Sequence, residues 1–120
     1  MNFIRRLLNK RKHKRYISCG ETYLIIHPYT ENEAKVQVID ISNGGCAFVY
    51  QGKKSDLEET GLANLLAENR LYLERTRYNT RSDTKLNPFA RRRGVEFVYM
   101  CIRDKQQLKE CVDASSLCLC

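Results

Sequence analysis

Hydrophobic and polar residues alternate with a period of two along much of the chain, a pattern that predicts β-strands. Residues 22–27 are rich in β-branched and aromatic side chains and stop at Pro28, which has no N–H to donate to a strand ladder. The same alternation recurs over residues 71–78 and 93–100, and the polar run 82–88 predicts a turn between them.

A hairpin is the strongest local prediction. Residues 36–41 and 46–50 carry the β pattern and are separated by Ser42-Asn43-Gly44-Gly45. An Asn-Gly pair tolerates the positive φ that tight hairpin turns require. We therefore expect a tight turn at Asn43 and Gly44.

Helical spacing occurs in shorter stretches. Residues 103–114 place three apolar side chains on one face, which predicts a C-terminal helix: Leu108, Cys111 and Val112. Ser55-x-x-Glu58 resembles a capping box for a helix that would include Leu62, Leu65 and Leu66, although Gly61 weakens it. Helix and strand both stay open for this stretch. Residues 3–8 have helical spacing as well.

Short strands separated by turns, with a helix at the end, predict a mainly β fold: a small antiparallel barrel with a C-terminal helix. A chain of 120 residues holds one such core. We expect a flexible basic arm over residues 1–16, the barrel over 17–102, and the helix and tail over 103–120. The fold alone does not specify a function.

Composition and apolar run length place the protein in solution. With 42% hydrophobic and 29% charged residues, the chain has the composition of a globular protein. No apolar run approaches the roughly 20 residues that cross a bilayer. Arg5, Arg6 and Lys10 interrupt the one candidate signal sequence. We expect a cytoplasmic protein.

The net charge of +7 is concentrated at the amino terminus. Residues 1–16 contain seven basic side chains and no acid, so the other 14 of the 21 basic residues balance the 14 acids. A basic segment on a neutral body attracts phosphate-bearing partners such as nucleic acid, a nucleotide or an anionic membrane surface. It could also be only a solvated terminus.

The six cysteines and two histidines do not form a metal or catalytic motif. In a reducing compartment we expect free thiols, with Cys46 and Cys101 buried as small hydrophobic side chains. There is no C-x-x-C pair, and neither histidine has a carboxylate or serine companion by motif. We therefore expect no metal, no cofactor and no enzymatic activity.

Two motifs carry candidate binding chemistry. Arg11 and Arg15 form an R-x-x-x-R pair, and guanidinium groups grip phosphate or the O6 and N7 edge of guanine. The spacing is weak evidence by itself, since Arg77 and Arg81 share it. Period-two geometry puts Asp40 and Ser42 on one face of a strand end. A carboxylate there would accept from guanine N1 and N2, and a hydroxyl would bind a base or a phosphate.

Glycines complete the second motif, because they let backbone N–H groups approach an anion. The sequence 40–45 thus reads D-x-S-x-x-G, with Asn43, Gly44 and Gly45 in the turn. Asp, Ser, Asn and Gly are also common turn formers, and alone they favour that simpler interpretation.

An R-x-x-x-R pair about 25 residues ahead of D-x-S-x-x-G resembles the PilZ family of bacterial cyclic di-GMP receptors. The later Gly94-x-x-Phe97 resembles a further element of the family, and residues 53–69 depart most from it. The resemblance implies that Arg11 and Arg15 hold phosphates and guanine bases, and that Asp40, Ser42 and Gly45 recognise a guanine. Lys10, Asn43 and Gly44 are secondary candidates.

The resemblance implies a single-domain receptor for cyclic di-GMP whose arm changes conformation on binding and signals to a protein partner in control of motility, biofilm or polysaccharide. One alternative is a small nucleic-acid-binding protein, in which Arg91, Arg92 and Arg93 would widen the basic patch of the arm. The other is an adaptor of the same fold that binds no nucleotide. The complete pair of motifs favours the receptor.

Overall fold

The computed structural model describes residues 15–17 and 21–116, with side chains for residues 21–115. Its elements in chain order are β1 (Arg15–Ile17), β2 (Thr22–Ile26), β3 (Ala34–Ser42), β4 (Gly45–Gln51), the 3-10 helix η1 (Lys54–Asp56), β5 (Thr60–Ala67), β6 (Arg70–Asn87), β7 (Ala90–Val98) and α2 (Ile102–Ser116). The fold is mainly β, as predicted.

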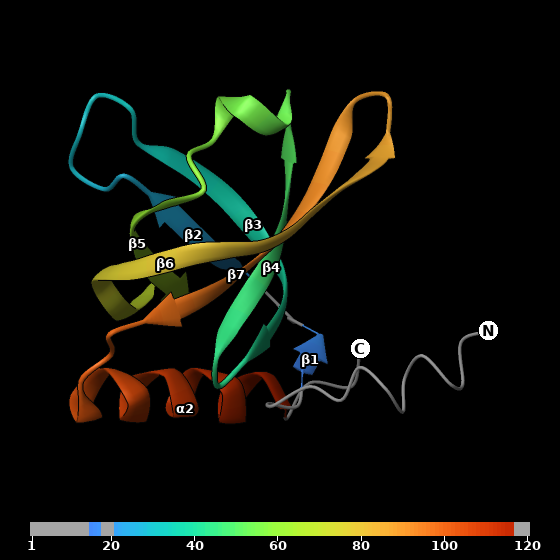
Figure 1. Cartoon of the computed structure of the whole chain (residues 1–120). Coiled ribbons are helices and arrows are strands. Elements are labelled where there is room, and N and C mark those ends of the chain that lie inside the picture. Colours follow the sequence, from blue (N-terminus) through green and yellow to red (C-terminus); the bar gives the residue numbers. More distant parts are fainter. Residues whose placement is uncertain (1–14, 18–20, 117–120) are drawn as a thin grey trace.

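Strands β2 to β7 close into an antiparallel barrel in the order β3-β2-β5-β6-β7-β4, with β4 pairing back onto β3. The short strand β1 extends this sheet at the end of β3, beyond the stretch that pairs with β2. Helix α2 lies along the lower end of the barrel in Figure 1, and η1 lies at the opposite end.

Alternating side chains fill the barrel. Leu24 and Ile26 of β2 and Phe48 of β4 are fully buried, as the period-two pattern predicted. From α2, the predicted apolar face of Leu108, Cys111 and Val112 joins the same core. A fully buried side chain of this size stabilises a fold by about 1.5–3 kcal/mol. The C-terminal helix therefore belongs to the barrel's core.

The β3–β4 hairpin forms at the predicted residues, but its turn differs from the prediction. Ser42 pairs with Gly45, and neither Asn43 nor Gly44 has a positive φ. The hydroxyl of Ser42 stabilises the turn instead, because its Oγ accepts the N–H groups of Gly44 and Gly45, each at 3.2 Å. The left-handed two-residue turn is between β5 and β6, at Glu68 and Asn69, both with positive φ.

Two other local predictions need correction, and the structure decides the alternative left open for residues 55–66. Ser55-x-x-Glu58 does not open a long helix: residues 54–56 form one 3-10 turn, and the following residues form strand β5 between β2 and β6. The polar run 82–88 is not a turn, since β6 continues to Asn87 and pairs with β7 to that point. Cys46 is buried as expected, but Cys101 is exposed just before α2.

Candidate functional site

A pocket of about 600 Å³ opens beside the β3–β4 turn. Its lining comes from the turn and the ends of its strands, from β6 and β7, and from the start of α2 with the residue Met100 before it. Its polar lining consists of Asp40, Ser42, Asn43, Gly44, Gly45, Arg81, Glu96 and Lys105, with apolar contributions from Val95, Phe97 and Met100. The whole D-x-S-x-x-G motif therefore lines one hollow in the surface.

Strand register aligns the motif residues across the sheet. Arg15 of β1 pairs with Ser42 of β3, which pairs with Gly45 of β4, which in turn pairs with Glu96 of β7. The backbone of Arg15, the second arginine of the R-x-x-x-R pair, is therefore next to the serine of the other motif. Arg11 and Lys10 lie outside the described residues, as do residues 3–8.

Asp40 reaches the pocket through a β-bulge. Val38 pairs with Phe48 and Asp40 with Ala47, so the residue between them is the extra one in β3. Bulges re-aim side chains and are common next to functional sites. The Asp40 carboxylate is 18% exposed and forms an ion pair with Arg92 through Oδ2 at 2.5 Å. Arg92 thereby holds the carboxylate at the pocket.

Gly45 is required for close packing of the turn against β7. A Cβ atom on Gly45 would lie 2.0 Å from the carbonyl oxygen of Val95, and neighbouring Gly44 accepts the N–H of Phe97 at 2.9 Å. The N–H of Gly45 is already donated to Ser42. The sequence analysis expected Gly45 to let a backbone N–H group approach an anion. In the structure, its main role is to let β4 pack closely against β7.

The pocket contains charged residues that sequence reasoning missed. Arg81 of β6 and Glu96 of β7 form an ion pair at 2.5 Å in its lining, and Lys105 of α2 also lines it. In the sequence, the one feature we assign to Arg81 is its R-x-x-x-R spacing with Arg77. Nothing local distinguishes these residues, because the pairing of β6 with β7 brings them to the motif.

The paired carboxylates leave the described pocket with little free positive charge. Asp40 is balanced by Arg92 and Glu96 by Arg81, and Lys105 is the lining cation with no carboxylate partner among residues 21–115. An anionic ligand would therefore need cations from elsewhere in the chain, and β1, which the basic segment precedes in the sequence, pairs with β3 at Asp40 and Ser42.

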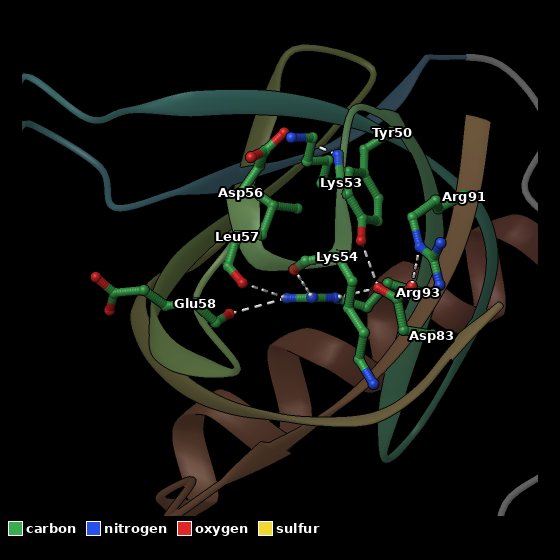
Figure 2. Close-up of polar contacts among 9 residues, drawn as sticks. All are labelled: Tyr50, Lys53, Lys54, Asp56, Leu57, Glu58, Asp83, Arg91 and Arg93. Atoms are coloured by element: carbon green, nitrogen blue, oxygen red, sulfur yellow. Dashed lines mark hydrogen bonds and ion pairs between the residues drawn. The ribbon is translucent and has the colours of Figure 1, made fainter. Parts of the chain in front are cut away.

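The three consecutive arginines of β7 do not form the surface patch that a nucleic-acid-binding protein would need. Arg93 is fully buried: its Nε donates to Asp83 at 2.8 Å, and its terminal nitrogens donate to the carbonyl groups of Lys54, Leu57 and Glu58 (Figure 2). Arg91 also pairs with Asp83. These arginines join β6, β7 and η1.

Asp83 is the centre of this second cluster, and its side chain is only 1% exposed. Burial raises the pKa of the Asp83 carboxyl, but hydrogen bonds from Tyr50, Arg91 and Arg93 outweigh burial, so the pKa lies below its ordinary value. The Tyr50 hydroxyl donates to Oδ2 at 2.5 Å (Figure 2). The cluster is a charged structural anchor.

The described residues contain no metal cluster, membrane-spanning helix or activated buried thiol. No group of three metal-ligating side chains occurs in residues 15–17 and 21–116. Over the same residues, no helix has the length and apolar character of a bilayer span. Burial raises the pKa of the Cys46 thiol, and raises that of Cys111 to about 11, so neither is an activated thiolate.

Comparison with known proteins identifies one family. The family model described as PilZ domain matches residues 9–114. A search of curated proteins finds no match. Among solved structures, the PilZ domain of YcgR from Escherichia coli with c-di-GMP matches with a TM-score of 0.72 and 11% identity, over 91% of this chain and 93% of that one.

Two longer proteins share the same fold. The MrkH–c-di-GMP complex of K. pneumonia matches with a TM-score of 0.70 and 17% identity, over 91% of this chain and 53% of that one. The inhibitor of motility MotI/DgrA from Bacillus subtilis matches with a TM-score of 0.61 and 20% identity, over 91% and 52%. The chain thus spans about half the length of these two.

Proposed function

The chain belongs to the PilZ domain family, and from this premise we propose that it is a non-catalytic receptor for cyclic di-GMP. The observation that carries the proposal is the pairing of Arg15 with Ser42, because it joins the end of the R-x-x-x-R motif to the D-x-S-x-x-G motif at one pocket. Its structural neighbours YcgR and MrkH are described with c-di-GMP.

The guanine bases and the phosphates of cyclic di-GMP would be bound by different residues. Asp40 would accept from the N1 and N2 donors of a guanine, since Arg92 occupies its Oδ2 and orients it. The two phosphates would be neutralised by Arg11 and Arg15, assisted by Lys10, because the described pocket has little free positive charge. Ser42, Asn43, Gly44 and Gly45 would shape the wall against which the ligand lies.

Binding would order the basic arm over the pocket. A ligand shifts such an equilibrium only by its differential affinity for the closed form, and charge-assisted hydrogen bonds from the arm exist only in that form. The changed arm, together with α2 beside the pocket, would then present a new surface to a downstream protein. Residues 1–16 would act as the switch and the barrel as its fixed platform.

Calorimetric titration with cyclic di-GMP tests the receptor proposal. We expect the wild type to bind cyclic di-GMP in preference to GTP, and Arg15→Ala and Asp40→Ala each to weaken binding about tenfold or more, because each loses charge-assisted hydrogen bonds. Arg77→Ala is the matched control: it belongs to the second R-x-x-x-R pair, is exposed on β6 and does not line the pocket. We expect it to bind as the wild type does.

A salt series separates the receptor from the nucleic-acid-binding alternative. Polyanion binding falls steeply with ionic strength and would tolerate Asp40→Ala, whereas a guanine pocket retains binding in moderate salt and requires Asp40. A wild type that shows no heat with cyclic di-GMP at any salt concentration would contradict the proposal.

A further inference from the structure

The pocket contains a second carboxylate outside the recognised motifs. Glu96 of β7 is paired in register with Gly45, and its side chain is 34% exposed at the pocket wall. An acidic side chain repels an anionic ligand unless it faces hydrogen-bond donors. The presence of Glu96 in a pocket for a dinucleotide therefore calls for a chemical reason.

The backbone of β6 is irregular at Arg81, whose side chain forms the ion pair with Glu96. Thr80 pairs with Val95 and Ser82 with Gly94, so Arg81 is the extra residue of a β-bulge. Its guanidinium reaches Glu96 at 2.5 Å and is itself 67% exposed. A bulge also precedes Asp40, whose carboxylate is held by Arg92 in the same way. The pocket thus contains two similar arginine–carboxylate pairs.

The two carboxylates are too far apart to serve one base. Asp40 lies opposite Ala47, which pairs with Gly94, and Glu96 is two residues further along β7. Two strand spacings of about 4.8 Å and two residue steps of about 3.4 Å separate their backbones. Between them Gly94 presents no side chain to the pocket. Each carboxylate can therefore face a different part of a ligand that lies over Gly94 between them.

We propose that Glu96 is a specificity-determining residue that reads the second guanine of the ligand, with Arg81 as its positioning residue; this rests on the proposed binding of cyclic di-GMP. Guanine presents two donors, N1–H and the 2-amino group, to a carboxylate, whereas adenine presents an acceptor at N1. Asp40 and Glu96 would each select one guanine, so the pocket would reject dinucleotides that contain adenine at either position.

The test compares cyclic di-GMP with cyclic GMP–AMP, which replaces one guanine by adenine. In the wild type we expect strong preference for cyclic di-GMP. In Glu96→Gln, the amide can donate to adenine N1 and loses the charge that favours guanine, so the ratio of the two dissociation constants should fall about tenfold or more. Glu110→Gln on α2 is the matched control, since Glu110 forms an exposed pair with Arg70 at 3.0 Å away from the pocket.

Two further variants complete the test. Glu96→Asp keeps the charge and should keep the preference for guanine, even where affinity drops. Arg81→Gln should weaken cyclic di-GMP binding while Glu96 still disfavours adenine. A ratio unchanged in Glu96→Gln, with cyclic di-GMP still bound, would overturn the inference and leave the receptor proposal intact. A wild type that binds neither dinucleotide would overturn both.

Discussion

Three consecutive arginines of β7 are divided between two faces of the strand, because successive side chains of a strand point to opposite faces. Arg92 faces the pocket side and holds Asp40, whereas Arg91 and Arg93 face the barrel interior and share Asp83. Buried charges need partners, and Arg93 has a carboxylate and three carbonyl groups. The three consecutive arginines therefore add little unpaired charge to the protein surface, because each has a carboxylate partner.

Replacing Arg93 tests this anchoring role. Arg93→Gln removes one partner of a buried ion pair and leaves carbonyl groups of residues 54–58 without their donor, so we expect the free energy of unfolding to fall by about 3–5 kcal/mol in urea denaturation. Arg77→Gln, on the exposed face of β6, should change it by less than about 0.5 kcal/mol. Equal effects of the two changes would contradict the anchoring role.

At the scale of the elements, β-bulges in β3 and β6 help to place charged side chains at the pocket. One extra residue in β3 precedes Asp40, and one extra residue in β6 is Arg81 itself. The hairpin β3–β4 then packs on β7 so tightly that only glycine fits at position 45. The pocket therefore depends on the pairing of β4 with β7.

Gly45→Ala tests that dependence. The new Cβ would lie 2.0 Å from a backbone oxygen of β7, so the strands must separate. We expect a loss of stability of about 1–3 kcal/mol, as for overpacking, together with weaker cyclic di-GMP binding. Asn43→Ala, at the exposed turn position, should leave the free energy of unfolding nearly unchanged. Amide hydrogen exchange of β4 and β7 would show whether the pairing has opened.

Strand β5 illustrates how tertiary pairing overrides a local helix signal. Residues 55–66 contain a sequence that resembles a capping box and leucines near helical spacing, yet β5 pairs with β2 on one side and β6 on the other. Without β5 the barrel would stay open at two edges. Long-range hydrogen bonds of this kind leave no local trace in the sequence.

At the scale of the molecule, the pocket includes Lys105 of α2, whereas Arg93 of the Asp83 cluster donates to Lys54 of η1. Helix α2 and η1 lie at opposite ends of the barrel (Figure 1). The ion pairs at the pocket are partly exposed, whereas Asp83 and Arg93 of the cluster are buried. The proposed ligand site and the buried ionic cluster are therefore at different ends of the barrel. At low pH, protonation of Asp83 in the buried cluster should lower the stability of the whole fold.

The acid stability of the protein tests the role of that cluster. The pKa of Asp83 is lowered in the folded chain, so its contribution is complete above the ordinary aspartate pKa of about 4 and is lost as pH falls through the lower, folded pKa. Tyr50→Phe removes one hydrogen bond to the carboxylate and raises its folded pKa. We expect acid unfolding at a higher pH, and a loss of about 1–3 kcal/mol at pH 7.

Tyr23→Phe is the control for that experiment. Tyr23 packs its ring under Lys35, and among residues 21–115 its hydroxyl has no hydrogen-bond partner shown in the structure. Circular dichroism against pH should therefore give the wild-type transition for Tyr23→Phe. The same midpoint in Tyr50→Phe would contradict the assignment of acid sensitivity to Asp83.

Period-two alternation and the apolar face of residues 103–114 were enough to predict a small barrel with a C-terminal helix, because burial of alternate side chains is a local property of each strand. The two binding motifs were also readable, since each lies within six consecutive residues. Only the tertiary structure decided that Glu96 and Arg81 join Asp40, that Arg93 is buried, and that residues 60–67 form a strand. Those outcomes depend on which strands pair and in which register, and pairing is set by the whole core.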